Sequence, residues 1–277
     1  MLGHAVMRVL SAQERFAVHG TQVEDAAAPY YLNAESPPSD WAPLVACHYV
    51  INCIGMLKPA VNESDAGSLR QAILVNALFP HRLAEAAAAT GARILHMSTD
   101  GVFSGHAARP YVESDPTDCP DAYGKTKALG ECPAANVLNI RCSIIGRDPV
   151  WGKGLVERVL RGPDGAELCG FEDQIWNGVS TLQFGRLCRG VLEQDAFDRI
   201  RRVSPVHHFC PNSPISKYDL LCLIREAAGK QLVIRRARSA IEGGFHVLGT
   251  CFAELRGVHP DSGDWRPVIS DLIANNT

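Results

Sequence analysis

Short apolar runs alternate along the chain with longer segments of helical pattern, and this alternation predicts βαβ units with a parallel sheet. Two runs, 49–54 and 93–98, are nearly all apolar, as strands buried on both faces of a sheet must be. Between them, 68–90 is rich in Ala and Leu, and Gly91 supplies a helix stop. Because Pro80 lies inside this stretch, we expect the helix to kink or restart there.

A second unit of the same kind follows, with a helical pattern at 123–131, a strand at 137–141 and a turn at Gly146. An additional strand pattern occupies 15–22. These segments together predict an α/β fold built around one parallel sheet.

The pattern loosens in the second half, where Gly- and Pro-rich connections separate shorter helices at 180–193 and 216–228. We therefore predict a sheet domain over 1–146 and a smaller lobe over 147–277, from which segments can return to the sheet.

The composition is that of an ordinary globular chain: 277 residues, 46% hydrophobic and 21% charged. Its 27 basic and 30 acidic residues give a net charge of −3, which offers no surface for phosphate backbones or anionic membranes. We predict no nucleic acid and no membrane as partner. The sequence has no apolar run of about 18 residues and no leader-like start, so we expect a cytoplasmic protein.

The cysteines and histidines lack the spacing of metal ligands. The ten cysteines are scattered without a C-x-x-C pair, and most lie in apolar runs, so we predict buried reduced thiols; a reactive or paired thiol is the alternative. The ten histidines include no H-x-x-x-H or H-x-x-H, and we predict no metal site.

The most suggestive polar pair is Tyr123 and Lys127, because residues four apart share one face of a helix. An ammonium beside a phenol stabilises the phenolate and lowers the pKa of the phenol, which makes it a tunable general acid. The alternative is a surface helix with a solvated lysine.

Two hydroxyls, Ser98 and Thr99, follow the apolar run that ends at Met97. The carboxyl ends of strands are where open α/β sheets bind ligands. The alternative is a hydroxyl-rich turn that caps the next segment. A hydroxyl, a phenol and an ammonium together suit reduction of a carbonyl by a nicotinamide cofactor.

At these residues the chain resembles the dTDP-4-dehydrorhamnose reductase family of extended short-chain dehydrogenases/reductases, which includes sugar-nucleotide-binding relatives in polysaccharide synthesis. The resemblance runs from about residue 2 to 228 and rests on HMSTDGVFSG, YVESDP, YGKTKALGE, NIRCSIIG and SPISKYDLL, in that order. It implies a Rossmann-like, doubly wound parallel sheet with a smaller C-terminal substrate lobe. It also implies NADP or NAD as cofactor and reduction of a nucleotide-activated keto-deoxysugar, for the synthesis of cell-surface polysaccharide. A homodimer is compatible with it.

For the site, the resemblance implies Tyr123 as proton donor, Lys127 as its electrostatic partner and cofactor ligand, and Thr99 at the carbonyl, with Ser98 beside it. Asn76 would be a structural or relay residue near the cofactor, with an ordinary helix asparagine as the alternative. The other implied cofactor-binding residues are Gly3, Cys53, Ile54, Gly55, Cys142, Ser143 and Ile144.

The lobe is expected to supply polar groups for the diphosphate and the sugar. Candidates are Arg147, Lys153 and the pair Asp173 and Gln174. A solvated loop lysine and an ordinary turn are the alternatives for Lys153 and for the pair.

The sequence departs from the family at Gly101, where Tyr or Cys is common, and at its start. Residues 1–6 resemble only the tail of the Gly-rich turn that holds the pyrophosphate, with Gly3 as its last glycine, and no other segment has G-x-x-G-x-x-G or G-x-G-x-x-G. We expect that the first, central strand is lacking, through a misplaced start or a true loss. We further expect a marginal fold with a slot beside 50–54 that is empty, closed by collapse of the sheet, or filled by another segment.

Two consequences follow for function. The run 15–22 ends without the Arg or Lys that favours a 2′-phosphate, so NADP and NAD both remain open. Because the Gly-rich phosphate-binding turn is incomplete, a second hypothesis stays open. It is a non-catalytic binding or regulatory subunit, or an inactive truncated reductase, on the same scaffold.

Overall fold

The computed structural model describes residues 1–22, 30–41, 46–148, 152–240 and 244–275. Its centre is a parallel sheet with the strand order β1-β2-β3-β8. The strands are β1 (Tyr49–Asn52), β2 (Arg93–Met97), β3 (Val137–Arg141) and β8 (Val206–His208). The predicted α/β class with a parallel sheet is confirmed.

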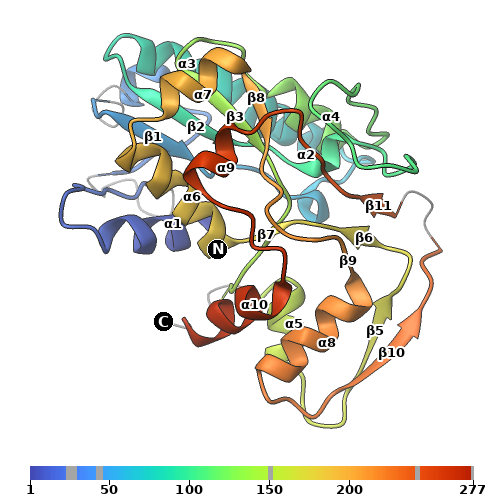
Figure 1. The fold of residues 1–277 in the computed structure, drawn as a ribbon. Coiled ribbons are helices and arrows are strands. Elements are labelled where there is room, and N and C mark those ends of the chain that lie inside the picture. The colour runs from blue at the N-terminus through green and yellow to red at the C-terminus, as the bar shows by residue number, and fades with distance from the viewer. Residues whose placement is uncertain (23–29, 42–45, 149–151, 241–243, 276–277) are drawn as a thin grey trace.

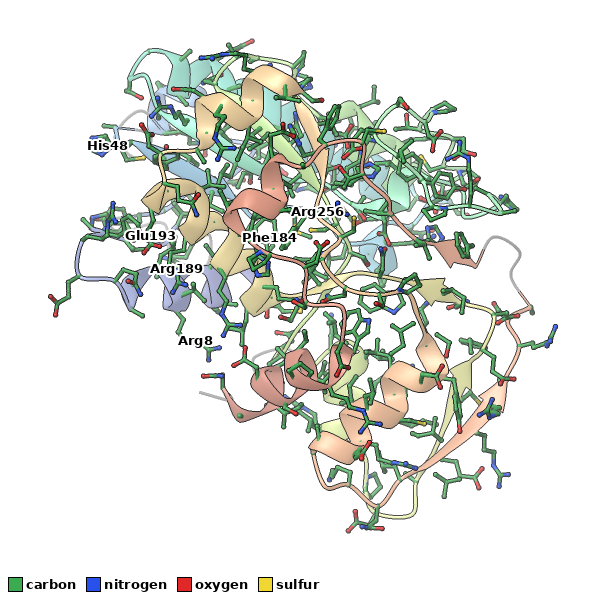
Figure 2. The ribbon with its side chains drawn as sticks, in the orientation of Figure 1. Arg8, His48, Phe184, Arg189, Glu193 and Arg256 are labelled. Atoms are coloured by element: carbon green, nitrogen blue, oxygen red, sulfur yellow. The ribbon has the colours of Figure 1, made fainter. Side chains whose placement is uncertain are left out.

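Helices cover both faces of this sheet (Figure 1). The face of Ile94 and Val137 packs against α3 (Phe79–Ala88), which follows α2 (Ala66–Ala72) and a π-helical segment, η3 (Ile73–Leu78). The face of Leu95 and Leu138 packs in a core shared by α1 (Leu2–Ser11), α6 (Thr181–Glu193), α7 (Phe197–Val203) and α9 (Glu254–Val258). Phe184 of α6, labelled in Figure 2, is fully buried in that core.

The helix predicted at 68–90 is interrupted where the proline is expected to disturb it. Pro80 stands in the first turn of α3, immediately after η3. Proline has no N–H to donate to a preceding turn, and π-helical turns are a common way for a helix to absorb such a break. The interruption places Asn76 in the widened turn, buried and facing the sheet's carboxyl edge.

The strand predicted at 15–22 is wrong, because only an isolated bridge between Gln22 and Tyr31 forms there. A strand needs a neighbour to complete its backbone hydrogen bonds. Within the described ranges, β1 pairs with β2 alone and stands at the end of the strand order. His48, just before β1, lies at the rim of the molecule in Figure 2. Among the described residues no strand pairs with the side of β1 away from β2. The slot beside 50–54 stays a prediction.

The second half of the chain forms a lobe with its own apolar core, seen below the sheet in Figure 1. Its helices are α5 (Leu155–Arg161), α8 (Lys217–Ala227) and α10 (Trp265–Ala274). Its paired strands are β5 (Glu167–Phe171) with β10 (Val233–Ala237), β6 (Ile175–Trp176) with β9 (Ile215–Ser216) and β11 (Phe245–His246), and β4 (Ile144–Ile145) with β7 (Val179–Ser180). Four elements that follow residue 146, namely α6, α7, β8 and α9, belong to the sheet side of the molecule. The division into domains at 1–146 and 147–277 stays a prediction.

All ten cysteines have free thiols, but the expectation of burial is wrong for three of them. Cys47, Cys169 and Cys251 are exposed; Cys169, for example, points outward from the two-stranded part of the lobe, which covers only one face of β5. Among the described residues no group of three or more His, Cys, Asp or Glu could hold a metal ion. No described helix is both long and apolar enough to cross a membrane.

Candidate active site

Two short helices bring the predicted hydroxyl and phenol together at the carboxyl end of β2. The turn η4 (Asp100–Val102) begins at Thr99, whose hydroxyl oxygen accepts a hydrogen bond from the Gly101 amide at 3.0 Å. The helix α4 (Ala122–Leu129) packs directly on that turn, because a Cβ at Gly124 would lie 2.2 Å from the Gly101 carbonyl oxygen. Only glycine allows this approach, so Gly124 sets how closely Tyr123 lies to Thr99.

Tyr123 lies half-buried beside Thr99, and the two side chains interact. A Cβ at Gly101 would lie 3.2 Å from Cε1 of Tyr123 and 3.3 Å from Oγ1 of Thr99, so the missing side chain leaves the ring edge uncovered. Burial raises the pKa of Tyr123 to about 12, and the interaction with Thr99 opposes that rise. The expected lowering of this pKa is not observed, because the effect of burial is larger than that of the Thr99 hydroxyl. The phenol therefore stays protonated at neutral pH.

Lys127 lies one turn further along α4 and is 5% exposed. Its ammonium donates a hydrogen bond to the carbonyl oxygen of Met97, at 2.7 Å. Burial lowers the pKa of Lys127 to about 8, while the nearby carboxylate of Glu131 raises it. The group can therefore hold or release a proton close to neutral pH.

Asn76 fastens the loop after β1 to the same place. Its amide oxygen accepts from the Met56 N–H at 2.7 Å, and its amide nitrogen donates to the Met56 carbonyl at 3.0 Å and to the Thr126 hydroxyl at 3.3 Å. Because Thr126 belongs to α4, this side chain ties that loop to the helix of Tyr123 and Lys127. The geometry favours a structural role for Asn76.

Several residues implied for the cofactor converge around Lys127. Gly3 of α1 faces Cys53, with a Cβ on Gly3 placed 4.0 Å from that of Cys53. A Cβ on Gly55 would lie 3.5 Å from the amide oxygen of Asn76 and 3.9 Å from Nζ of Lys127. These backbone surfaces next to a buried ammonium fit the nicotinamide and ribose side of a dinucleotide.

The remaining cofactor candidates take backbone roles in the structure. The Ile54 amide donates to the side-chain oxygen of Asn52 at 3.1 Å. Cys142 is fully buried, and its electrostatic neighbours include Lys127 and Cys53. Ser143 and Ile144 belong to the stretch that pairs with β7, where the Ser143 carbonyl accepts from Val179 N at 2.8 Å.

Ser98 is fully buried, and its hydroxyl donates to the Glu131 carboxylate at 2.6 Å. Its place is therefore in a buried polar network, whereas Thr99 is the strand-end hydroxyl that meets Tyr123.

The four substrate candidates do not gather at one place. Arg147 donates to the buried Glu157 at 2.7 Å. Lys153 is exposed, and the carboxylate of exposed Asp173 accepts from the Ser239 amide at 2.9 and 3.0 Å. Gln174 donates to the Ser239 hydroxyl and accepts from the Lys217 ammonium.

Lys217 is a lobe residue to which sequence reasoning assigned no role. It starts α8, and its charge interacts with those of Asp100 and Lys58 on the sheet side. Burial lowers its pKa. The motif SPISKYDLL contains this lysine, but no local pattern indicates that its charge interacts with that of Asp100.

Replacing Gly124 by alanine is expected to separate α4 from η4, because the added carbon would clash with the Gly101 carbonyl and lie 2.6 Å from Cβ of Cys119. Overpacking of this kind costs about 1–3 kcal/mol. Chemical denaturation measures the loss. Gly257→Ala is the matched control, since a Cβ at this other helical glycine meets nothing within 4 Å; equal losses in the two variants would contradict the close-approach argument.

The comparisons with known proteins agree with this arrangement. The model of the RmlD substrate binding domain matches residues 1–242. The spore coat polysaccharide biosynthesis protein SpsK of Bacillus subtilis is 26% identical over 74% of this chain and 72% of its own. A dTDP-4-dehydrorhamnose reductase of Streptomyces griseus is 38% identical, over 38% of this chain and 34% of its own, so the match spans about a third of that relative.

Among solved structures, a dTDP-4-dehydrorhamnose reductase from Bacillus anthracis in complex with NADP superposes with a TM-score of 0.80 at 17% identity, over 99% of this chain and 94% of that chain. At this identity the likeness establishes the fold, including the Rossmann-like arrangement of the sheet. From the match over residues 1–242, this chain belongs to the RmlD substrate binding domain family.

Proposed function

We propose that this chain is an NAD(P)-dependent reductase of a nucleotide-activated keto-deoxysugar. The observation that carries the proposal is the adjacent pair Thr99 and Tyr123 at the end of β2, with the buried Lys127 one helical turn away. The relatives named dTDP-4-dehydrorhamnose reductase support the reaction class, and SpsK supports a role in polysaccharide synthesis.

The surroundings of Thr99, Tyr123 and Lys127 suit a different role for each residue. Thr99 orients the carbonyl oxygen by a hydrogen bond, and Tyr123 donates its proton to that oxygen as it gains charge. The raised pKa of Tyr123 suits this direction, because a reductase needs the protonated phenol at the start. Lys127 holds a positive charge beside the reacting groups while its ammonium is anchored to Met97.

The cofactor would be held by Gly3, by the backbone of 53–55 and by Lys127, near Cys142 to Ile144, and when bound it supplies the hydride. Asn76 would keep the 53–56 loop in place for it. The structure favours neither NADP nor NAD.

The substrate would lie between the sheet edge and the lobe. Lys217, which is hydrogen-bonded to Gln174, interacts with charges on the sheet side, and we add Lys217 to the candidates for the diphosphate. Arg147 is committed to Glu157 and is a weaker candidate. A homodimer and a cytoplasmic location stay predictions.

The test is a reductase assay of the purified chain at millimolar NADPH or NADH, with dTDP-4-keto-6-deoxyhexose as substrate and loss of nicotinamide absorbance as readout. We expect slow, substrate-dependent oxidation of the cofactor and a reduced sugar in the product. Binding of the nucleotide sugar without any turnover would instead favour the non-catalytic binding subunit.

A further inference from the structure

A buried ion pair joins the end of the α4 region to β3. Arg141 donates to Glu131 through Nε and Nη2, both at 2.7 Å, and the two side chains are only 6% and 8% exposed. Glu131 also accepts the Ser98 hydroxyl at 2.6 Å. Burying an ion pair yields little net stability, so stability alone does not account for its place beside the candidate site.

Glu131 lies just beyond the end of α4, four residues after Lys127. They also bind consecutive residues of the sheet, since the Lys127 ammonium donates to the Met97 carbonyl and the Glu131 carboxylate accepts from Ser98. Both charged groups therefore lie at the carboxyl end of β2, where the carboxylate of Glu131 acts on the ammonium of Lys127.

A buried ammonium needs a compensating negative charge, and Lys127 has no salt bridge among those of the described residues. The titratable groups that face it from the packed elements are Cys53 after β1, His96 on β2, Cys142 after β3 and Glu131 after α4. Burial raises the pKa of both thiols, to about 12 for Cys53, and lowers the pKa of His96, so all three are uncharged at neutral pH. Glu131 is the remaining group of this set that carries a negative charge.

Arg141 holds that carboxylate in place from the other side. Its guanidinium contacts His208 of β8, Nη1 to Nε2 at 3.3 Å, and stacks over Phe103 with 5.2 Å between the guanidinium carbon and the ring centroid. A bidentate arginine fixes the orientation of a carboxylate as well as its position.

We propose that Glu131 is a positioning residue for Lys127: its carboxylate, fixed by Ser98 and Arg141, supplies the charge that keeps the buried ammonium protonated and directed at the end of β2. The role given to Lys127 rests on the proposed function. The effect of Glu131 on the charge of Lys127 is a property of the free chain and stands apart from turnover.

The test is NMR of the full chain labelled with ¹³C at the lysine Cε, whose shift reports the charge of each ammonium. The six lysines give six signals, and Lys127→Arg identifies the one of interest. In the unsubstituted chain we expect the Lys127 signal to titrate near pH 8. Glu131→Gln should lower that midpoint by about one pH unit or more, because an opposite charge at close range favours the charged form.

Glu131→Gln leaves Arg141 buried without its partner, and this variant alone could fail to fold. The double variant Glu131→Gln/Arg141→Met removes both charges and is the safeguard. Because the double variant also removes the positive charge of Arg141, we expect its midpoint to lie between those of Glu131→Gln and the unsubstituted chain. A midpoint equal to that of the unsubstituted chain would mean that the ion pair supplies Lys127 with no net charge, and the proposal would be overturned.

Glu157→Gln is the matched control. Glu157 is also a buried carboxylate held by two arginines, Arg147 at 2.7 Å and Arg161 at 3.1 Å, but it belongs to the lobe. We expect this variant to lose stability and to leave the Lys127 midpoint unchanged. An equal shift in the Glu157 variant would mean that loosening of the fold, and not the charge of Glu131, moves Lys127.

The reductase assay adds a second readout. If the chain is active, the alkaline limb of its turnover–pH profile should shift to lower pH in Glu131→Gln, by the same number of pH units as the NMR midpoint. An inactive chain would count against the proposed function, while the NMR midpoints would still decide the role of Glu131.

Discussion

Tyr123→Phe is expected to lower turnover by about 10²-fold or more, with little change in the melting temperature. The variant removes the proton donor but keeps the ring in its half-buried place beside Gly101. The folded chain gives up the interaction between the phenol and Thr99, while the packing of the ring is unchanged. Steady-state kinetics at millimolar cofactor together with thermal denaturation measure both quantities on the same preparation.

Tyr111→Phe is the control for loss of a phenol elsewhere. The Tyr111 hydroxyl accepts from the Ala107 amide at 3.0 Å, away from Thr99, and the ring is buried against Phe103. This variant should lose about 1 kcal/mol of stability from the unpaired amide and keep its turnover. Equal activity of Tyr123→Phe and the unsubstituted chain would remove Tyr123 from the mechanism.

The sequence predicts well those elements whose pattern is local. Strands buried on both faces, such as 93–97, are mostly apolar, and the helix that ends before Gly91 has its own stop residue. The spacing of Tyr123 and Lys127 depends only on helix geometry, so it too can be derived from the sequence.

The predictions that fail are those that depend on contacts with residues far away in the sequence. The run 15–22 has a strand's composition, but no described strand pairs with it, and its backbone remains irregular. The pKa of Tyr123 depends on burial beneath packed elements, which no spacing reveals. From the sequence alone, Arg147 could be a ligand of the substrate or the partner of an ion pair. Only the fold shows that it pairs with Glu157.

The same long-range dependence hides Glu131 from sequence reasoning. In the sequence it is only the last letter of YGKTKALGE, four residues beyond Lys127. Its importance comes from Ser98 and Arg141, which reach it from the ends of two different strands.

Titration of the 277-residue chain with NADPH and NADH is expected to give binding weaker than micromolar. A dinucleotide's pyrophosphate is normally held by several backbone amides of a Gly-rich turn and the helix behind it. In this structure Gly3 already lies inside α1, next to Cys53, so the amides of the first turn of α1 are what the chain offers the phosphates in place of a full Gly-rich turn. With the ribose side left to Gly55 and Lys127, as we propose, we expect saturable binding only at millimolar cofactor.

Nicotinamide fluorescence and thermal shift measure this affinity independently, because a ligand at about 100 times its Kd stabilises the folded state by about 2.7 kcal/mol. Lys127→Met should abolish the residual binding, since it removes the buried ammonium beside Gly55. Lys125→Met on the same helix is the control; its exposed ammonium donates to the Pro120 carbonyl at 2.6 Å, and its loss should leave the affinity unchanged. Micromolar binding with a clear rise in melting temperature would show that the phosphates are held by other groups of this chain.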